Sequence, residues 1–158
     1  MAQPSLDLPT AHRWFAIECN NAAWSLLEAP VRSAEEAERM VHLAHAACHH
    51  WLQVGTPLHH ARGLLLVANV SAEMGWPQPA LHFSQRVLDL LQTCDDAADW
   101  DLAFAEDARS RALAVAGDPR AASVREAARV AGERIAEAED KAMFEQWFLH
   151  ELPPACRL

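Results

Sequence analysis

Tyrosine is absent from this sequence of 158 residues, and glycine occurs only 5 times. The abundant residues are alanine, leucine, glutamate and arginine, which lose little conformational entropy in a helix, so the composition favours an all-α fold. No run approaches the roughly 18 apolar residues of a membrane-spanning helix, and the N-terminal residues lack the basic and apolar regions of a signal peptide. We therefore expect a cytoplasmic protein that does not enter a membrane.

Basic residues are also few. The chain has 13 lysines and arginines against 22 aspartates and glutamates, which gives a formal net charge of -9 at pH 7. It contains no basic run, and the overall negative charge would repel a phosphate backbone. We expect no nucleic-acid partner.

The cysteines show no pattern of pairing. They are scattered and form no C-x-x-C pair, which argues against a disulfide framework or a zinc knuckle and predicts reduced thiols at Cys19, Cys48, Cys94 and Cys156. The chain length and a 51% share of hydrophobic residues are ordinary for one globular domain. We expect a single domain over residues 1–158, with short tails at about 1–8 and 152–158.

Local start and stop signals divide the chain into seven predicted helices. Ser33 and Glu36 can form a capping box, and Gly55 can end the helix that they start. Thr56 followed by Pro57 is an N-cap with a first-turn proline, so the next helix follows as a tight hairpin. The predicted helices cover about 9–27, 33–54, 57–75, 77–91, 100–116, 119–136 and 139–150.

One joint between helices occurs twice. The pattern G-x-P-x-x-A begins at Gly75 and again at Gly117, an offset of 42 residues (117 − 75). Such an offset indicates an internal repeat. In each copy a helix ends at the glycine and a second helix begins with proline, and the small side chains of Ala80 and Ala122 would let the two pack closely.

The small residues Ala68, Gly75 and Ala80 resemble those of tetratricopeptide-like helical repeats, over about residues 57–136. The offset is longer than the usual repeat, and the aromatic positions of the motif are missing. Segments such as ECNNAAWSLLE and HLAHAACHHWLQVGTPLHHAR also resemble small bacterial proteins of this helical-repeat character. The resemblance implies three antiparallel hairpins and a closing C-terminal helix, stacked as a superhelix around a continuous core.

Histidines crowd one side of the predicted helix 33–54. His42, His45 and His49 have helical spacing, so their side chains should form one column. A helical wheel places this column beside Glu38 on the polar side, opposite Met40. The three imidazoles could bind Zn, Fe, Ni or Cu, with Glu38 as a fourth ligand. They could equally form a polar partner surface or a solvated face without function.

A second histidine pair, His59 and His60, lies at the start of the next predicted helix. The positive end of the helix dipole disfavours imidazolium there, so these side chains should titrate low. They form either a surface pair or a site between helices, folded back towards His49 or His50.

The resemblance to tetratricopeptide-like repeats implies a concave groove, lined by the first helix of each pair. Alignment on the repeated glycine gives the groove positions Arg62, Asn69, Glu73, Phe104, Asp107 and Arg111. The first predicted helix adds two candidate lining residues, Glu18 and Asn21. Most tryptophans sit at core spacings, whereas Trp76 and Trp100 lie near helix starts and are expected to be exposed; the core candidates are Trp14, Trp24, Trp51 and Trp147.

Catalytic signatures are missing. The sequence has no G-x-S-x-G elbow, no glycine-rich phosphate loop and no dinucleotide fingerprint, which leaves enzymatic activity undecided. We expect a helical-repeat module that binds a protein, a peptide or a small ligand in its groove. The alternative is a metal-binding protein or small metalloenzyme that uses the histidine column with Glu38 or Glu18. A third hypothesis is a homodimer contact at the histidine face that loosens below about pH 6.5.

Overall fold

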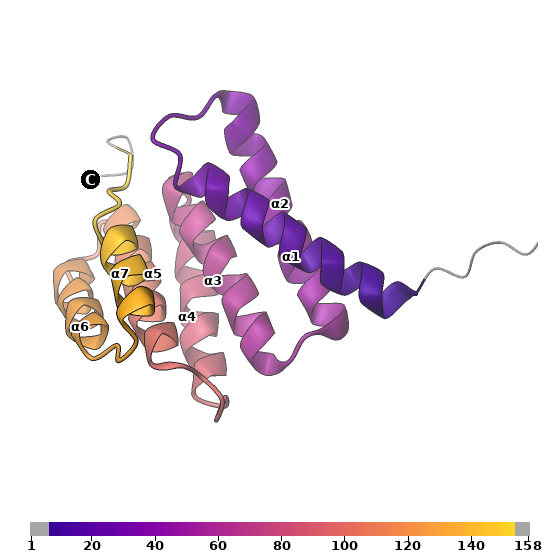
Figure 1. The fold of residues 1–158 in the computed structure, drawn as a ribbon. Coiled ribbons are helices and arrows are strands. Elements are labelled where there is room, and N and C mark those ends of the chain that lie inside the picture. The colour runs from indigo at the N-terminus through magenta and orange to yellow at the C-terminus, as the bar shows by residue number, and fades with distance from the viewer. Residues whose placement is uncertain (1–6, 154–158) are drawn as a thin grey trace, which may run out of the picture.

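The computed structural model describes residues 7–153, and every regular element in this range is an α-helix. The prediction of an all-α fold is therefore confirmed. Most of the predicted tails, together with Cys156, lie outside the described residues. The helices are α1 (Leu8–Leu27), α2 (Ala34–Val54), α3 (Pro57–Glu73), α4 (Pro77–Leu91), α5 (Asp99–Val115), α6 (Ala121–Glu133) and α7 (Ala138–Phe148) (Figure 1).

Consecutive helices pack in pairs. The most extensive contacts join α1 to α2, α3 to α4 and α5 to α6, which is consistent with the predicted hairpins. The pairs follow one another across the molecule, and α7 lies beside α6 and against α5 (Figure 1). Because α3 contacts both α1 and α5, the first helices of the three pairs are neighbours.

The helix starts at Ser33 and Thr56 are as predicted. The backbone N–H of Ser33 donates to Glu36 Oε2 at 2.8 Å and that of Glu36 donates to Ser33 Oγ at 3.2 Å, which completes the capping box. At α3 the backbone N–H of Thr56 donates to His59 Nδ1 at 3.2 Å. His59 thus takes the place that glutamate has in α2, and it stabilises the start of α3.

The two repeated glycines have the same backbone geometry. Gly75 has a φ of 70° and Gly117 a φ of 67°, both in the left-handed region that favours glycine. After each glycine the next backbone N–H reaches back to close the helix: Trp76 donates to Ser71 and Asp118 to Leu113, both at 2.9 Å. These are Schellman-type helix ends.

The two copies differ after the glycine. Helix α4 starts at Pro77 as predicted, but α6 starts at Ala121, two residues later than Pro119. The carboxylate of Asp118 accepts the backbone N–H of Arg120 at 2.9 Å, which holds this segment in a turn. Ala80 is fully buried whereas Ala122 is exposed, so the predicted close packing occurs in the first copy and is wrong for the second.

Six of the seven helices contribute buried side chains to one hydrophobic cluster. The largest of these side chains include Leu27, Met40, Leu66, Val87, Phe104, Phe144 and Trp147. The prediction that Trp14 belongs to the core is wrong, since this residue is 56% exposed near the start of α1. Among the described helices none has the length and apolar character required to cross a membrane. Cys19, Cys48 and Cys94 form no disulfide.

Candidate ligand-binding cleft

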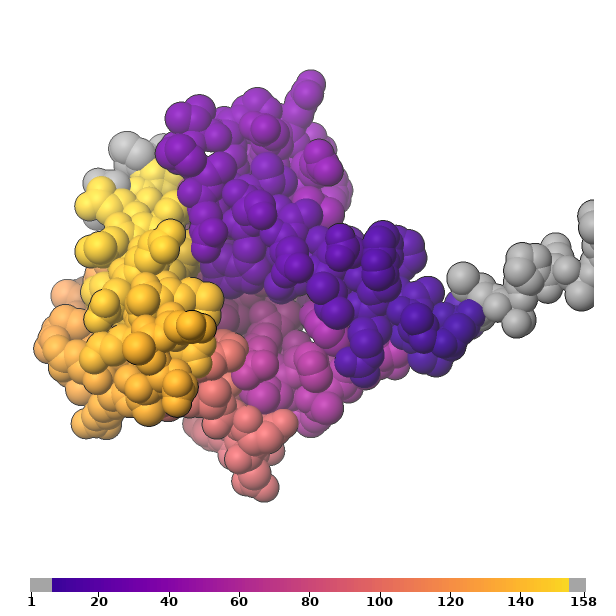
Figure 2. Space-filling view, in the orientation of Figure 1, coloured from indigo at the N-terminus to yellow at the C-terminus, as the bar shows by residue number. Residues whose placement is uncertain are grey.

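A cleft of about 470 Å³ lies where α1, α3, α5 and α7 meet. In the space-filling view it is a recess between α7 and α1, with α3 at its base (Figure 2). Four helices that are distant in sequence therefore shape one concave surface. Its lining residues are Asn20, Asn21, Trp24, Ser25, Glu28, Arg62, Leu65, Trp100, Phe104, Met143 and Trp147.

Aromatic rings form much of the cleft wall. Trp24 of α1 and Trp147 of α7 meet edge to face, with ring centroids 5.1 Å apart and an angle of 87° between the ring planes. Trp100 and Phe104 of α5 form a second such pair, at 6.0 Å and 85°. Perpendicular pairs of this kind are a favourable aromatic geometry, and they fix the orientation of all four rings.

The polar groups of the cleft come mainly from α1. Asn20 donates to the side-chain oxygen of Asn21 at 3.4 Å, and Ser25 donates to the backbone carbonyl of Asn21 at 2.9 Å. Glu28, the residue that follows the last turn of α1, is exposed. The α1 side of the cleft thus carries two amides, a hydroxyl and a carboxylate.

Arg62 of α3 completes the polar lining. Its Nε and Nη2 atoms donate to the two carboxylate oxygens of Asp101, both at 2.9 Å. Asp101 is only 2% exposed, and the Arg62 guanidinium lies 4.3 Å from the centroid of the Trp100 ring. Because the pair is bidentate and partly buried, the positive charge of Arg62 is balanced within the protein.

Two arginines bind the C-terminal end of α7, the helix that forms one side of the cleft. Arg111 donates to the backbone carbonyl of Trp147 at 3.1 Å, and Arg125 donates to that of Phe148 at 2.6 Å. Both arginines also bind the fully buried carboxylate of Asp107, at 2.5 Å and 3.1 Å. Carbonyls at a helix C-terminus have no partner within the helix and carry partial negative charge, so guanidinium groups stabilise them.

The structure brings only some of the predicted groove residues to the cleft. Asn21, Arg62 and Phe104 line it, as expected. Glu18 is exposed but does not line the cleft. Four further candidates are buried and are not among the lining residues: Asn69, Glu73, Asp107 and Arg111.

Glu73 and Asn69 illustrate the difference. Glu73 forms an ion pair with Arg32, from the loop after α1. Its Oε2 atom also lies 3.2 Å from His150 Nε2. Asn69 lies on the same face of α3 as Arg62 and Glu73, since it follows the first by seven residues and precedes the second by four. It is 2% exposed, and neither atom of its amide has a hydrogen-bond partner within residues 7–153.

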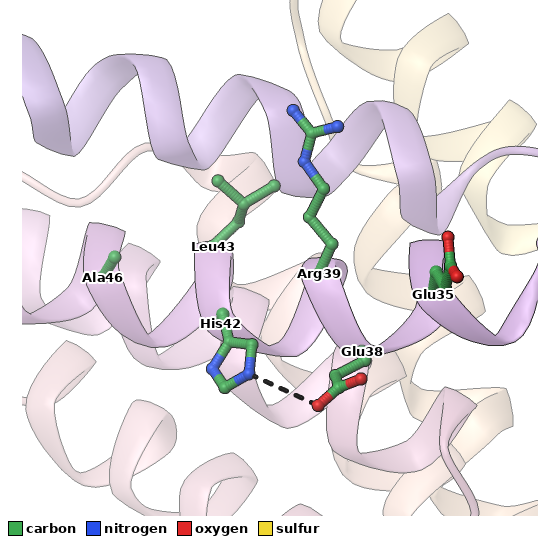
Figure 3. A pocket seen from close by; sticks show the side chains of 6 residues that line it. All are labelled: Glu35, Glu38, Arg39, His42, Leu43 and Ala46. Carbon is green, nitrogen blue, oxygen red and sulfur yellow. Dashed lines mark ion pairs between the residues drawn. The ribbon is translucent and has the colours of Figure 1, made fainter.

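The histidine column lies on the polar side of α2, as predicted. His42, His45 and His49 are exposed, whereas Met40 is fully buried. His42 faces Glu38, with 3.9 Å between Nε2 and Oε1, in a shallow depression of about 420 Å³ (Figure 3). The ring centroid of His45 lies 6.1 Å from that of Phe83 of α4. The three imidazoles therefore have separate surroundings.

His49 belongs to a group that sequence reasoning missed. His12 of α1 and His50 of α2 approach each other with 2.7 Å between their Nδ1 atoms, and the ring of His49 lies 5.4 Å from that of His50. Phe15 stacks on His50 at 5.3 Å. Burial lowers the pKa of His50 first, and the neighbouring His12 and His49 lower it further. Only the crossing of α1 over α2 creates this cluster, and the sequence carries no local signal for it.

No group of three or more histidine, cysteine, aspartate or glutamate side chains within residues 7–153 is arranged to hold a metal ion. The site predicted from His42, His45, His49 and Glu38 therefore stays a prediction from spacing. The second histidine pair has a structural partner, since His59 stacks on Trp51 with ring centroids 4.5 Å apart. The pKa of His59 is lowered, as predicted, but burial is the first cause and the neighbouring Arg62 and Arg13 follow.

Comparison with known proteins assigns no family to the chain. It matches no protein-family model, no curated protein and no solved structure. Its function must therefore be inferred from the geometry of the cleft and of the helices that form it.

Proposed function

We propose that this chain is a cytoplasmic, TPR-like helical-repeat module that binds a peptide or a small ligand in the cleft between α1, α3, α5 and α7. The observation that carries the proposal is the convergence of four aromatic rings and several polar side chains on one concave surface. Binding sites in proteins are usually concave, mostly apolar and supplied with a few oriented polar groups. The cleft volume of about 470 Å³ lies within the range that such sites occupy.

The repeat character is supported by the helix order and by the turns. Three pairs of consecutive helices pack in sequence. In the second pair Gly75 lies between the two helices, in the third pair Gly117 does, and the two glycines have nearly the same φ. Stacked helix pairs place their first helices side by side and so form extended concave surfaces. The first helices here are α1, α3 and α5, and all three line the cleft.

The ligand class is supported by the chemistry of Asn20 and Asn21. A side-chain amide has both a donor and an acceptor, so it can pair with a peptide group of a ligand as well as with a small polar molecule. The aromatic walls offer a large apolar contact area with little loss of side-chain entropy. The cleft thus suits a ligand with an apolar body and a few hydrogen-bonding groups.

The experiment compares two substitutions of the same kind. Ser25→Trp places a large ring in the cleft, whereas Ser123→Trp places it on the exposed surface of α6. In the contacts observed, Ser25 donates to the backbone carbonyl of Asn21 in α1 and Ser123 to that of Arg120, the N-cap residue of α6, so the two changes remove comparable bonds. Each variant and the parent protein are incubated with an array of random peptides and a panel of small molecules.

We expect the parent protein and Ser123→Trp to retain the same ligands and Ser25→Trp to lose them. Circular dichroism before the assay checks that both variants keep their helical content. If Ser25→Trp retains the same ligands, binding takes place elsewhere on the protein. If the parent protein retains none, the binding function itself is wrong.

A further inference from the structure

The aromatic groups of the cleft surround a small space with ring faces and edges in fixed directions. The two edge-to-face pairs, Trp24 with Trp147 and Trp100 with Phe104, come from three different helices. The face of an aromatic ring carries negative electrostatic potential, and tryptophan is the strongest of the three aromatic residues in this respect. Three of the four rings here are tryptophan.

Cations of the protein already use rings in and beside this cleft. The guanidinium of Arg62 lies 4.3 Å from the ring centroid of Trp100, and both residues line the cleft. Beside the cleft, Arg111 lies 4.5 Å from the ring of Trp147 and Arg125 lies 4.1 Å from the ring of Phe148. These contacts lie within the range of about 6 Å for a cation–π interaction. Trp147 is 4% exposed and contacts both Arg111 and the stacked ring of His150, and Phe104 is 6% exposed. The half-buried rings of Trp24 and Trp100 are therefore the ones that a ligand can reach in the cleft.

The charge of the lining residues favours the same class of ligand. Arg62 and Glu28 are the charged residues that line the cleft within the described part of the chain. Asp101 neutralises Arg62 through two hydrogen bonds, which leaves the exposed carboxylate of Glu28 as the unbalanced charge. The net charge of -9 adds a long-range attraction for cations and a repulsion for anions.

We infer that the cleft selects an alkylated ammonium cation, held by its aromatic rings and by the carboxylate of Glu28. This inference rests on the binding function proposed above and specifies its ligand. A methylated ammonium group spreads its charge over an apolar surface and is weakly hydrated, so aromatic walls can replace its water at little cost. The same group occurs on small molecules and on methylated lysine side chains, and the cleft recognises the chemistry that they share.

The test uses a pair of probes that differ in charge alone. Choline carries a trimethylammonium group, and 3,3-dimethylbutan-1-ol is its neutral analogue of nearly the same shape. Isothermal titration calorimetry at low ionic strength gives both dissociation constants. We expect choline to bind about 2- to 30-fold more tightly than the neutral analogue, the range that a cation–π contact provides between exposed and desolvated sites.

Two substitutions locate the binding site. Glu28→Gln removes the carboxylate and should weaken choline binding several-fold without affecting the neutral analogue, whereas Glu38→Gln removes an exposed carboxylate on α2 and should change neither. Trp24→Phe keeps an aromatic ring but weakens its attraction for a cation, so it should reduce the preference for choline. A peptide with trimethyllysine, compared with the same peptide carrying norleucine, distinguishes a protein-borne ligand from a free one.

Equal affinity for choline and its neutral analogue, or no binding of choline and of the trimethyllysine peptide, would overturn the inference. The binding function is judged separately by the loss of array ligands in Ser25→Trp. If neutral ligands bind the parent protein and are lost in that variant, the cleft is a binding site for a different class of molecule.

Discussion

Asp107 is the residue whose replacement should disturb the closing helix most. Its carboxylate is fully buried and binds both Arg111 and Arg125, and these arginines hold the last carbonyls of α7. Asp107→Asn keeps the size of the side chain but removes its charge, which leaves the guanidinium of Arg111 buried and without a counterion. Breaking a buried ion pair by removing one partner costs about 3–5 kcal/mol.

For a chain of this length, 1 kcal/mol corresponds to a shift in melting temperature of about 2–4 °C, so Asp107→Asn should lower the melting temperature by about 6–20 °C. Urea unfolding followed by circular dichroism measures the free energy directly. Asp118→Asn is the control, because Asp118 also pairs with an arginine but is only partly buried, and its partner Arg120 is exposed. Its effect should be much smaller, since exposed ion pairs contribute little.

A double substitution tests whether the loss comes from the unpaired charge. Asp107→Leu combined with Arg111→Met removes both members of the buried pair, while Arg125 remains 41% exposed at its side chain and can be hydrated. The double variant should lose less stability than the sum of the two single changes. If Asp107→Asn unfolds at the same urea concentration as Asp118→Asn, the ion pairs of Asp107 with Arg111 and Arg125 do not stabilise the position of α7.

Three further predictions concern other parts of the molecule. Asn69→Leu removes a buried amide without observed partners, so the urea midpoint should rise by an amount equivalent to about 1–3 kcal/mol; a lower midpoint would mean that the amide is bonded. Because the pKa of His50 is lowered in the folded protein, the unfolded chain takes up a proton at this residue at a higher pH than the folded protein does. The free energy of unfolding should therefore fall as the pH drops below 6.5. Thermal melts from pH 8 to pH 5 should show a smaller decrease for His50→Gln than for the parent protein. Gly132→Ala would press a methyl group into the ring of Phe144 and should lower the free energy of unfolding by about 1–3 kcal/mol. In Gly63→Ala the new methyl group would lie 3.4 Å from its nearest neighbour, the Cα atom of Cys48, so this variant should keep the stability of the parent protein. Equal melting temperatures for the two variants would contradict the close packing of α6 and α7.

The helix boundaries could be predicted because their signals are local. The capping box at Ser33 and the repeated glycines act through hydrogen bonds that span six residues or fewer. The predicted start of α6 at Pro119 is wrong, although Pro119 follows its glycine at the same spacing as Pro77. The carboxylate of Asp118 accepts the backbone N–H of Arg120 and holds this segment in a turn, which competes with an earlier helix start. The G-x-P-x-x-A pattern carries no information on this hydrogen bond.

The cleft could be predicted only in part. Alignment on the repeated glycine places Arg62 and Phe104 in the groove that the resemblance implies, the first predicted helix adds Asn21, and all three line the cleft. The alignment gives no information on where α7 packs, because that helix is separated from α1 and α3 by long stretches of chain. Asp107 is fully buried beside Arg111 and Arg125, the two arginines that bind the last carbonyls of α7. The contact between His12 and His50 also depends on how two helices cross and could not be read from either helix alone.

The matching φ values at Gly75 and Gly117 have a consequence for engineering. A segment that begins just after one of these glycines and ends on the other starts and finishes at the same backbone geometry. A duplicated copy of residues 76–117, inserted after Gly117, would therefore add two helices without requiring a new turn. The protein contains, in its own sequence, the unit and the connector for a longer array, and α7 would still close the end.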